Sequence, residues 1–139
     1  MGGSLQEASG WEGSAVTVDE FIKQVQERGG FDTREHAERA TRATLAVLGQ
    51  RLAGGEPSDL ASQLPDELAE LARYDGPAES FDTAEFYRRV ADREGAGCTP
   101  GQAREHAMAV MSTVVDQVSE GERQDLASQL PADYQELLR

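Results

Sequence analysis

The residues best suited to chemistry form two acidic pairs in a repeated motif. Two Gly-Glu-x-x-Asp segments place Glu56 with Asp59 and Glu122 with Asp125. Clustered carboxylates can bind hard divalent cations or act as an acid and a base. Acidic side chains also suit the first turn of a helix, near the positive end of its dipole. We favour this helix-capping role, and the alternative is a small-ligand or divalent-metal site, including a hydrolase, built from the duplicated carboxylates.

Short polar residues accompany these acids, since Ser62 and Gln63 are repeated as Ser128 and Gln129. Packing of a hydrophobic core explains why the neighbouring leucines are repeated, but it does not explain the repeated serine and glutamine. We expect the repeated polar side chains to hydrogen-bond between the two copies, and the alternative is that they face a partner. The candidate repeat-motif site comprises Glu56, Asp59, Gln63, Glu122, Asp125 and Gln129.

The two histidines and the single cysteine are the other reactive side chains. His36 and His106 are not equivalent in the repeat, which argues against a duplicated site, and we expect both to be solvated or locally capped. Cys98 precedes a predicted helix whose dipole could lower the pKa of the thiol, although we expect a passive thiol. A single cysteine forms no internal disulfide.

The sequence contains none of the common catalytic motifs. We find no Gly-x-Ser-x-Gly elbow, no phosphate-binding glycine loop and no His-Glu-x-x-His segment. We therefore assign no catalytic residue, no metal ligand and no cofactor, and we predict a protein that is not an enzyme.

An internal duplication must position these residues. The heptapeptide Asp59-Leu-Ala-Ser-Gln-Leu-Pro65 recurs unchanged 66 residues later as Asp125-Leu-Ala-Ser-Gln-Leu-Pro131. Upstream the offset becomes 65, which indicates one inserted residue near Gly95 to Pro100. We predict a flexible tail at residues 1–16, a first helical repeat at 17–73, a linker at 74–80 and a second repeat at 81–139.

Apolar residues at spacings of three and four predict four helices in each repeat. The first helices begin with capping boxes, Thr17 with Glu20 and Asp82 with Glu85. The second helices begin at Asp32 and at Thr99. The heptapeptides predict short third helices with Asp59 and Asp125 in the first turn, and the prolines after them begin fourth helices. The expected fold is all-α without a β-sheet, two four-helix units docked with pseudo-twofold symmetry into one body.

Composition narrows the possible partners. The 26 acidic and 13 basic residues give a formal net charge of -13, which repels nucleic acid and anionic membranes. No segment has the length of apolar sequence that a membrane span requires, and the N-terminus lacks a secretory signal pattern. We expect a cytoplasmic protein.

The repeated unit resembles a known family. It has Glu-Phe-x-x-x-Val near its start, an alanine-rich second helix and Gly-Glu-x-x-Asp-Leu-x-x-Gln-Leu-Pro near its end. The chain is thereby similar, from Thr17 to Leu138, to the bacterial domain-of-unknown-function family 2267 in two tandem copies. The resemblance implies a duplicated all-α architecture in a bacterial cytoplasmic protein, and it implies no catalytic residue.

These observations favour a non-catalytic interaction or regulatory module. Two docked helical units leave a groove that can accept a helix of another protein. The expected partner is therefore a protein, including a second copy of the chain, with no nucleic acid and no membrane.

Overall fold

All regular secondary structure in the described part of the chain is helical. The computed structural model describes residues 17–52, 60–73, 76–77 and 79–138, and it contains no strand within them. The helices are α1 (Val18–Gly29), α2 (Arg34–Leu52), α4 (Asp66–Ala72), α5 (Thr83–Glu94), α6 (Pro100–Gln117), α7 (Glu120–Gln129) and the 3₁₀ helix η2 (Ala132–Leu137). The predicted all-α class is confirmed. None of these helices is both long and apolar enough to cross a membrane.

Side-chain caps begin most of these helices, as the sequence predicts. Thr17 and Glu20 form a full capping box on α1, and Thr99 forms one with Gln102 on α6. Asp82 accepts the backbone N–H of Glu85 at 3.0 Å, but the Glu85 carboxylate pairs with arginines instead of completing a box. The predicted box on α5 is therefore only half formed.

The start of α2 differs from the prediction by one residue. The Thr33 hydroxyl, rather than the Asp32 carboxylate, accepts the backbone N–H of His36 at 3.1 Å. Thr33 is thus the N-cap, and this cap fixes the position of His36 in the first turn of α2.

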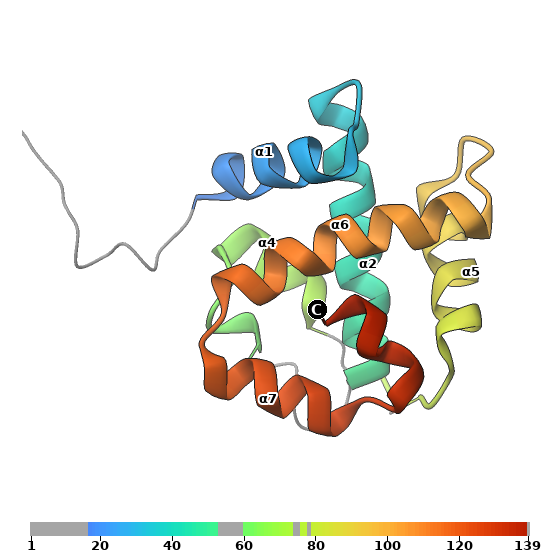
Figure 1. Cartoon of the computed structure of the whole chain (residues 1–139). Helices are drawn as coiled ribbons and strands as arrows, with labels where there is room; N and C mark the ends of the chain where they lie inside the picture. The colour runs from blue at the N-terminus through green and yellow to red at the C-terminus, as the bar shows by residue number, and fades with distance from the viewer. Residues whose placement is uncertain (1–16, 53–59, 74–75, 78, 139) are drawn as a thin grey trace, which may run out of the picture.

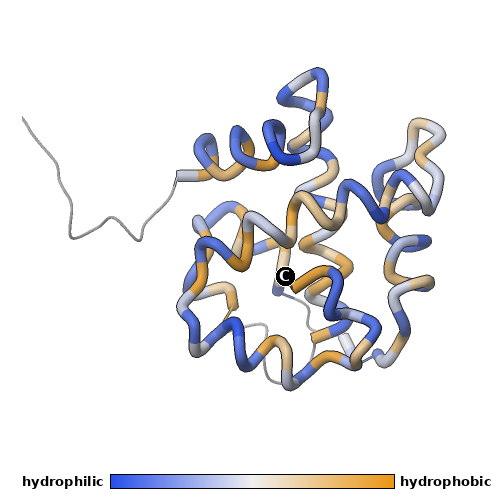
Figure 2. The backbone as a smooth tube through the Cα atoms, viewed as in Figure 1, coloured by the Kyte–Doolittle hydropathy of each residue, from blue (hydrophilic) through white to orange (hydrophobic). Residues whose placement is uncertain are grey.

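Both long helices lie at the centre of a single hydrophobic core. α2 crosses α6, α1 packs on both of them, and α5 also contacts both (Figure 1). In Figure 2 the outer side of α1 is hydrophilic and its apolar side faces α6. One continuous cluster of buried side chains contains residues from both predicted units. Helices of the two units are therefore packed into one body, whereas their pseudo-twofold relation remains a prediction.

The two heptapeptides bury their leucines to the same degree. Leu60 and Leu126 are 0% exposed, and Leu64 and Leu130 are each 6% exposed. The secondary structure within them differs, since Ser62 and Gln63 lie in a turn, whereas Ser128 and Gln129 belong to α7. Ser119 caps α7, so Asp125 lies beyond the first turn in which we predicted it. The fourth helices also differ, since α4 is an α-helix and η2 is a 3₁₀ helix.

Candidate metal centre

The two histidines and one buried carboxylate lie together where α2, α5 and α6 meet. His36 is in the first turn of α2, Glu94 is the last residue of α5, and His106 is in α6. The three helices contact one another pairwise, so each ligand-bearing backbone is fixed by packing. The site therefore combines a residue of the first predicted repeat with two residues of the second.

Distances between the polar atoms are short. The Nδ1 atom of His106 lies 2.8 Å from Glu94 Oε2, and the Nε2 atom of His36 lies 3.8 Å from Glu94 Oε1. One ligand atom from each of the three residues lies within 4.8 Å of the others. This is the one group of three or more potential metal ligands that the described part of the chain contains.

Glu94 occupies a position where a carboxylate needs a cation. Its side chain is 1% exposed, whereas the side chains of His106 and His36 are 15% and 37% exposed. A buried ionised carboxylate is costly unless it is paired, and the C-terminus of a helix carries a partial negative charge. Burial and the α5 dipole therefore both favour a positive charge beside Glu94, which either a protonated histidine or a metal ion provides.

A sharp turn brings the thiol of Cys98 to the same place. Gly95 and Gly97 have φ angles of +67° and +77°, and Ala96 between them has +54°. This left-handed backbone reverses the chain directly after Glu94. The Cys98 Sγ atom then lies 4.0 Å from His106 Nδ1, the same nitrogen that faces Glu94.

The surroundings of Cys98 disfavour the thiolate form of its side chain. Burial raises the pKa of Cys98 to about 11, the Glu94 carboxylate adds to this increase, and Arg39 opposes it. The hypothesis that a helix dipole lowers this pKa is wrong, and the passive thiol expected from the sequence agrees with the raised pKa. A bound cation would reverse this environment, because metals bind the thiolate form of cysteine.

Phe31 holds the imidazole rings in place. Its ring centroid lies 4.8 Å from that of His36 and 4.8 Å from that of His106, and the two imidazole centroids are 5.1 Å apart. Phe31 is itself buried. An aromatic wall of this kind restricts the rotation of both histidines and lowers the local dielectric, which strengthens the interaction of a cation with its ligands.

The donor set fits a tetrahedral metal ion. Zinc binds nitrogen and oxygen about 2.0–2.2 Å away and sulfur about 2.3 Å away, so tetrahedral donors are roughly 3.3–3.8 Å apart. The observed separations of 2.8, 3.8 and 4.0 Å lie around this range, with the first two made to different oxygens of Glu94. The three ligand atoms lie within 4.8 Å of one another, so small side-chain rotations would be needed to bring them to a common ion. Two imidazoles, a carboxylate and a thiol suit zinc or a similar transition metal better than magnesium or calcium, which prefer oxygen ligands.

The family of the chain is defined by a match that covers most of its length. A protein-family model described as "Uncharacterized conserved protein (DUF2267)" matches residues 18–137. The chain belongs to this family. The match is a single span across both predicted repeats, so the family assignment is confirmed without resolving two tandem copies. No curated protein matches the chain.

This member of the DUF2267 family carries its histidine cluster where the sequence argument did not place a site. We expected His36 and His106, as helical histidines without a fixed partner, to be solvated or locally capped. The side chain of His106 is instead 15% exposed and lies 2.8 Å from Glu94, whereas that of His36 is 37% exposed. A single site to which both repeats contribute does not require the same residue at corresponding positions of the two repeats. Glu94 was missed, although it continues the apolar face of α5 defined by Phe86 and Val90 at spacings of four. A charged residue in that register is the signal that could have revealed the site.

The repeat-motif residues do not gather around this centre. Glu56 and Asp59 lie outside the described residues. Glu122 is buried near the start of α7, and Asp125 is exposed on the same helix. Neither belongs to the ligand cluster that the described residues form.

The two glutamines of the motif have different surroundings. The Gln63 side-chain oxygen accepts the backbone N–H of Ser119 at 2.6 Å, which joins the first heptapeptide to the start of α7. This hydrogen bond agrees with the predicted structural role of Gln63. Gln129 is exposed.

Proposed function

We propose that this protein binds a divalent transition metal, with zinc the ion that its donor set favours, through His36, Glu94 and His106 with Cys98 as the fourth ligand. The observation that carries the proposal is the juxtaposition of the three ligand atoms within 4.8 Å around a buried carboxylate. The sequence had suggested, as an alternative, a metal site at the duplicated carboxylates. The proposed site lies instead at His36, Glu94 and His106.

The bound ion would act as a link between the two halves of the chain. His36 belongs to α2, whereas Glu94 and His106 belong to α5 and α6. A metal that binds all three stabilises the arrangement in which these helices are packed, because the site does not exist in the unfolded chain. We therefore propose a structural or metal-dependent regulatory role.

The test is a zinc titration of the full chain after removal of metal with a chelator and desalting. Calorimetry should show one saturable zinc site, and an excess of magnesium or calcium should not compete. His36→Gln, Glu94→Gln and His106→Gln should each weaken zinc binding by tenfold or more, because each removes one ligand. Circular dichroism of each variant verifies that it is folded.

A matched control separates this centre from the duplicated carboxylates. The double variant Glu122→Gln and Asp125→Asn removes acidic charge from α7 but leaves the three ligands intact. It should bind zinc as the unaltered chain does. Loss of binding in this control with no effect of the ligand variants would contradict the proposal, as would the absence of saturable binding.

Cobalt reports on the fourth ligand. A thiolate bound to cobalt gives a charge-transfer absorption in the near ultraviolet, which imidazole and carboxylate ligands do not. This band should be present in the unaltered chain and absent in Cys98→Ser. A spectrum that Cys98→Ser does not change would remove sulfur from the ligand set.

Binding of another protein, the function favoured by the sequence, stays a prediction. Within the described residues, Met108 is the one large apolar side chain that is exposed. An apolar docking face for a partner helix therefore has little support, and we place metal binding first.

A further inference from the structure

The thiol of Cys98 is the group of the proposed metal centre that a mild oxidant alters most readily. Its Sγ atom lies 4.0 Å from His106 Nδ1, and the residue is only partly buried, so small molecules in solution can reach it. Cysteine sulfur is oxidised stepwise, beginning with sulfenic acid, whereas imidazole and carboxylate groups resist the same reagents. Oxidation of the centre would therefore begin at sulfur.

The backbone holds this sulfur between two ligands. The amide N–H of Cys98 donates to the Gly95 carbonyl oxygen at 3.0 Å, and this hydrogen bond closes the left-handed turn that follows Glu94. The next residue, Thr99, is the N-cap of α6, the helix that carries His106. The end of α5 and the start of α6 thus fix the position of the thiol beside the cluster.

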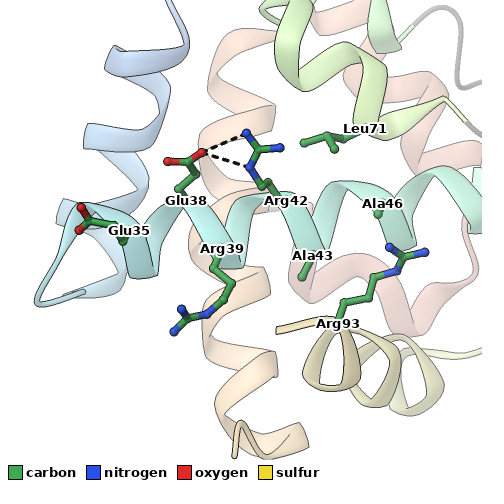
Figure 3. A pocket seen from close by; sticks show the side chains of 8 residues that line it. All are labelled: Glu35, Glu38, Arg39, Arg42, Ala43, Ala46, Leu71 and Arg93. Carbon is green, nitrogen blue, oxygen red and sulfur yellow. Dashed lines mark hydrogen bonds and ion pairs between the residues drawn. The ribbon is translucent and has the colours of Figure 1, made fainter. Parts of the chain in front are cut away.

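A positive charge near the sulfur favours its anionic form. Burial and Glu94 raise the pKa of the Cys98 thiol, and Arg39 of α2 opposes them. Figure 3 shows the Arg39 side chain leaving α2 away from Arg42, which pairs with Glu38. The guanidinium group of Arg39 and a bound metal ion therefore act in the same direction on the sulfur, and the metal binds it as the thiolate.

We propose that Cys98 makes the metal centre sensitive to oxidation, so that hydrogen peroxide releases the bound ion by oxidising its thiolate ligand. This inference rests on the proposed function, with sulfur as the fourth ligand. The thiolate attacks one peroxide oxygen, a sulfur–oxygen bond forms as the oxygen–oxygen bond breaks, and the hydroxide that leaves takes a proton from solvent. Sulfur is oxidised by two electrons to sulfenic acid, and the peroxide is reduced to water.

Release of the ion would remove the link between α2 and the other two helices of the centre. The sulfenic acid has no second cysteine in the chain with which to form a disulfide. Its reduction therefore requires a thiol from outside the chain, such as a small thiol in solution. The oxidised state would persist until that thiol restores Cys98 and the metal binds again.

The test compares zinc binding before and after oxidation of the full chain loaded with one equivalent of zinc. The chain is treated with hydrogen peroxide, and a reagent specific for sulfenic acid marks the oxidised residue for mass spectrometry. Zinc affinity is then measured by calorimetry on untreated and oxidised chain. We expect Cys98 to be marked and the affinity to fall by roughly tenfold or more, as when a ligand is lost. Reduction with excess small thiol and desalting should restore it.

Two variants separate oxidation of Cys98 from other effects of peroxide. Cys98→Ser keeps His36, Glu94 and His106, and peroxide should leave its zinc affinity unchanged. Met108 is an exposed side chain that peroxide also oxidises. Met108→Leu should therefore lose zinc affinity on oxidation to the same extent as the unaltered chain.

Three results would overturn the proposal. They are sulfenic acid at Cys98 without loss of zinc affinity, no oxidation of Cys98 in the zinc-loaded chain, and an equal loss of affinity in Cys98→Ser. A chain that never binds zinc contradicts the proposed function itself. A chain that binds zinc and keeps it through oxidation contradicts this inference alone.

Discussion

Leu60 and Leu126 occupy matching positions in the two repeats, and both are 0% exposed. His36 and His106 do not occupy matching positions, yet their ring centroids are only 5.1 Å apart. The repeat places glutamine opposite His36 and alanine opposite His106. Cys98 lies in the segment where the second repeat has its extra residue. Positions shared by the repeats thus serve packing, and the potential chemistry lies where the repeats differ.

The largest expected effect concerns the shared positions. Leu60→Ala and Leu126→Ala should each reduce the free energy of unfolding by about 2–5 kcal/mol, because each leaves a cavity in the core. The comparison predicts similar losses for the two variants, measured by chemical denaturation. A loss of less than ~1 kcal/mol at one position only would break the equivalence of the heptapeptides.

Metal binding to His36, Glu94 and His106, which have no equivalents in the repeat, should stabilise the folded chain. Zinc at one hundred times its dissociation constant should raise the free energy of unfolding by about 2.7 kcal/mol, since the ion binds only the folded chain. Thermal denaturation measures this change as an increase in Tm.

Glu94→Gln should reduce the zinc-dependent increase to about 1.4 kcal/mol or less at the same zinc concentration and retain a cooperative transition. The carboxylate is a proposed ligand, and glutamine has nearly the same shape. An undiminished increase in this variant would place the metal elsewhere.

A third comparison concerns the two central helices. α2 carries Gly49 where α6 carries Val115, and a Cβ atom at Gly49 would lie 2.3 Å from the backbone oxygen of Ala72. Gly49→Ala should therefore destabilise the fold by about 1–3 kcal/mol, as overpacking does. Chemical denaturation measures the loss.

Gly101→Ala in α6 is the control for this substitution. Its Cβ would meet no atom closer than 3.9 Å, so alanine should leave stability unchanged or increase it by up to ~1 kcal/mol. Equal effects at Gly49 and Gly101 would show that the close approach of α2 and α4 is not a constraint.

The smallest expected difference separates the two glutamines. Gln63→Ala should cost about 1 kcal/mol, because the backbone N–H of Ser119 loses its acceptor. Gln129 is exposed, and Gln129→Ala should change stability by less than ~0.5 kcal/mol. Denaturant titration can resolve the two variants, and a reversed order would assign the structural role to Gln129.

Much of the fold could be predicted from the sequence because its determinants are local. Thr17 with Glu20 and Thr99 with Gln102 fix helix starts through neighbouring residues, and Gly30 ends α1 with a left-handed φ of +65°. The errors at Asp32 and Glu85 arose where a second local partner competed. Thr33 caps α2, and Arg88 and Arg89 pair with Glu85.

The candidate centre could not be predicted in this way because its ligands come from three separate helices. The repeated motif predicted a site at Glu122 and Asp125, but both residues lie on α7 outside the ligand cluster. Only the crossing of α2 with α5 and α6 brings His36 to Glu94. Glu94 on the apolar face of α5 was a local signal, but its partners are set by tertiary structure.

X-ray absorption at the zinc edge of the full chain loaded with one equivalent of zinc would test the central claim most directly. We predict a four-coordinate ion with two imidazole nitrogens and one carboxylate oxygen at about 2.0–2.2 Å and one sulfur at about 2.3 Å. The spectrum should lose imidazole scattering in both His36→Gln and His106→Gln. A shell of oxygen ligands alone, without imidazole or sulfur, would contradict a metal centre shared by the two halves of the chain.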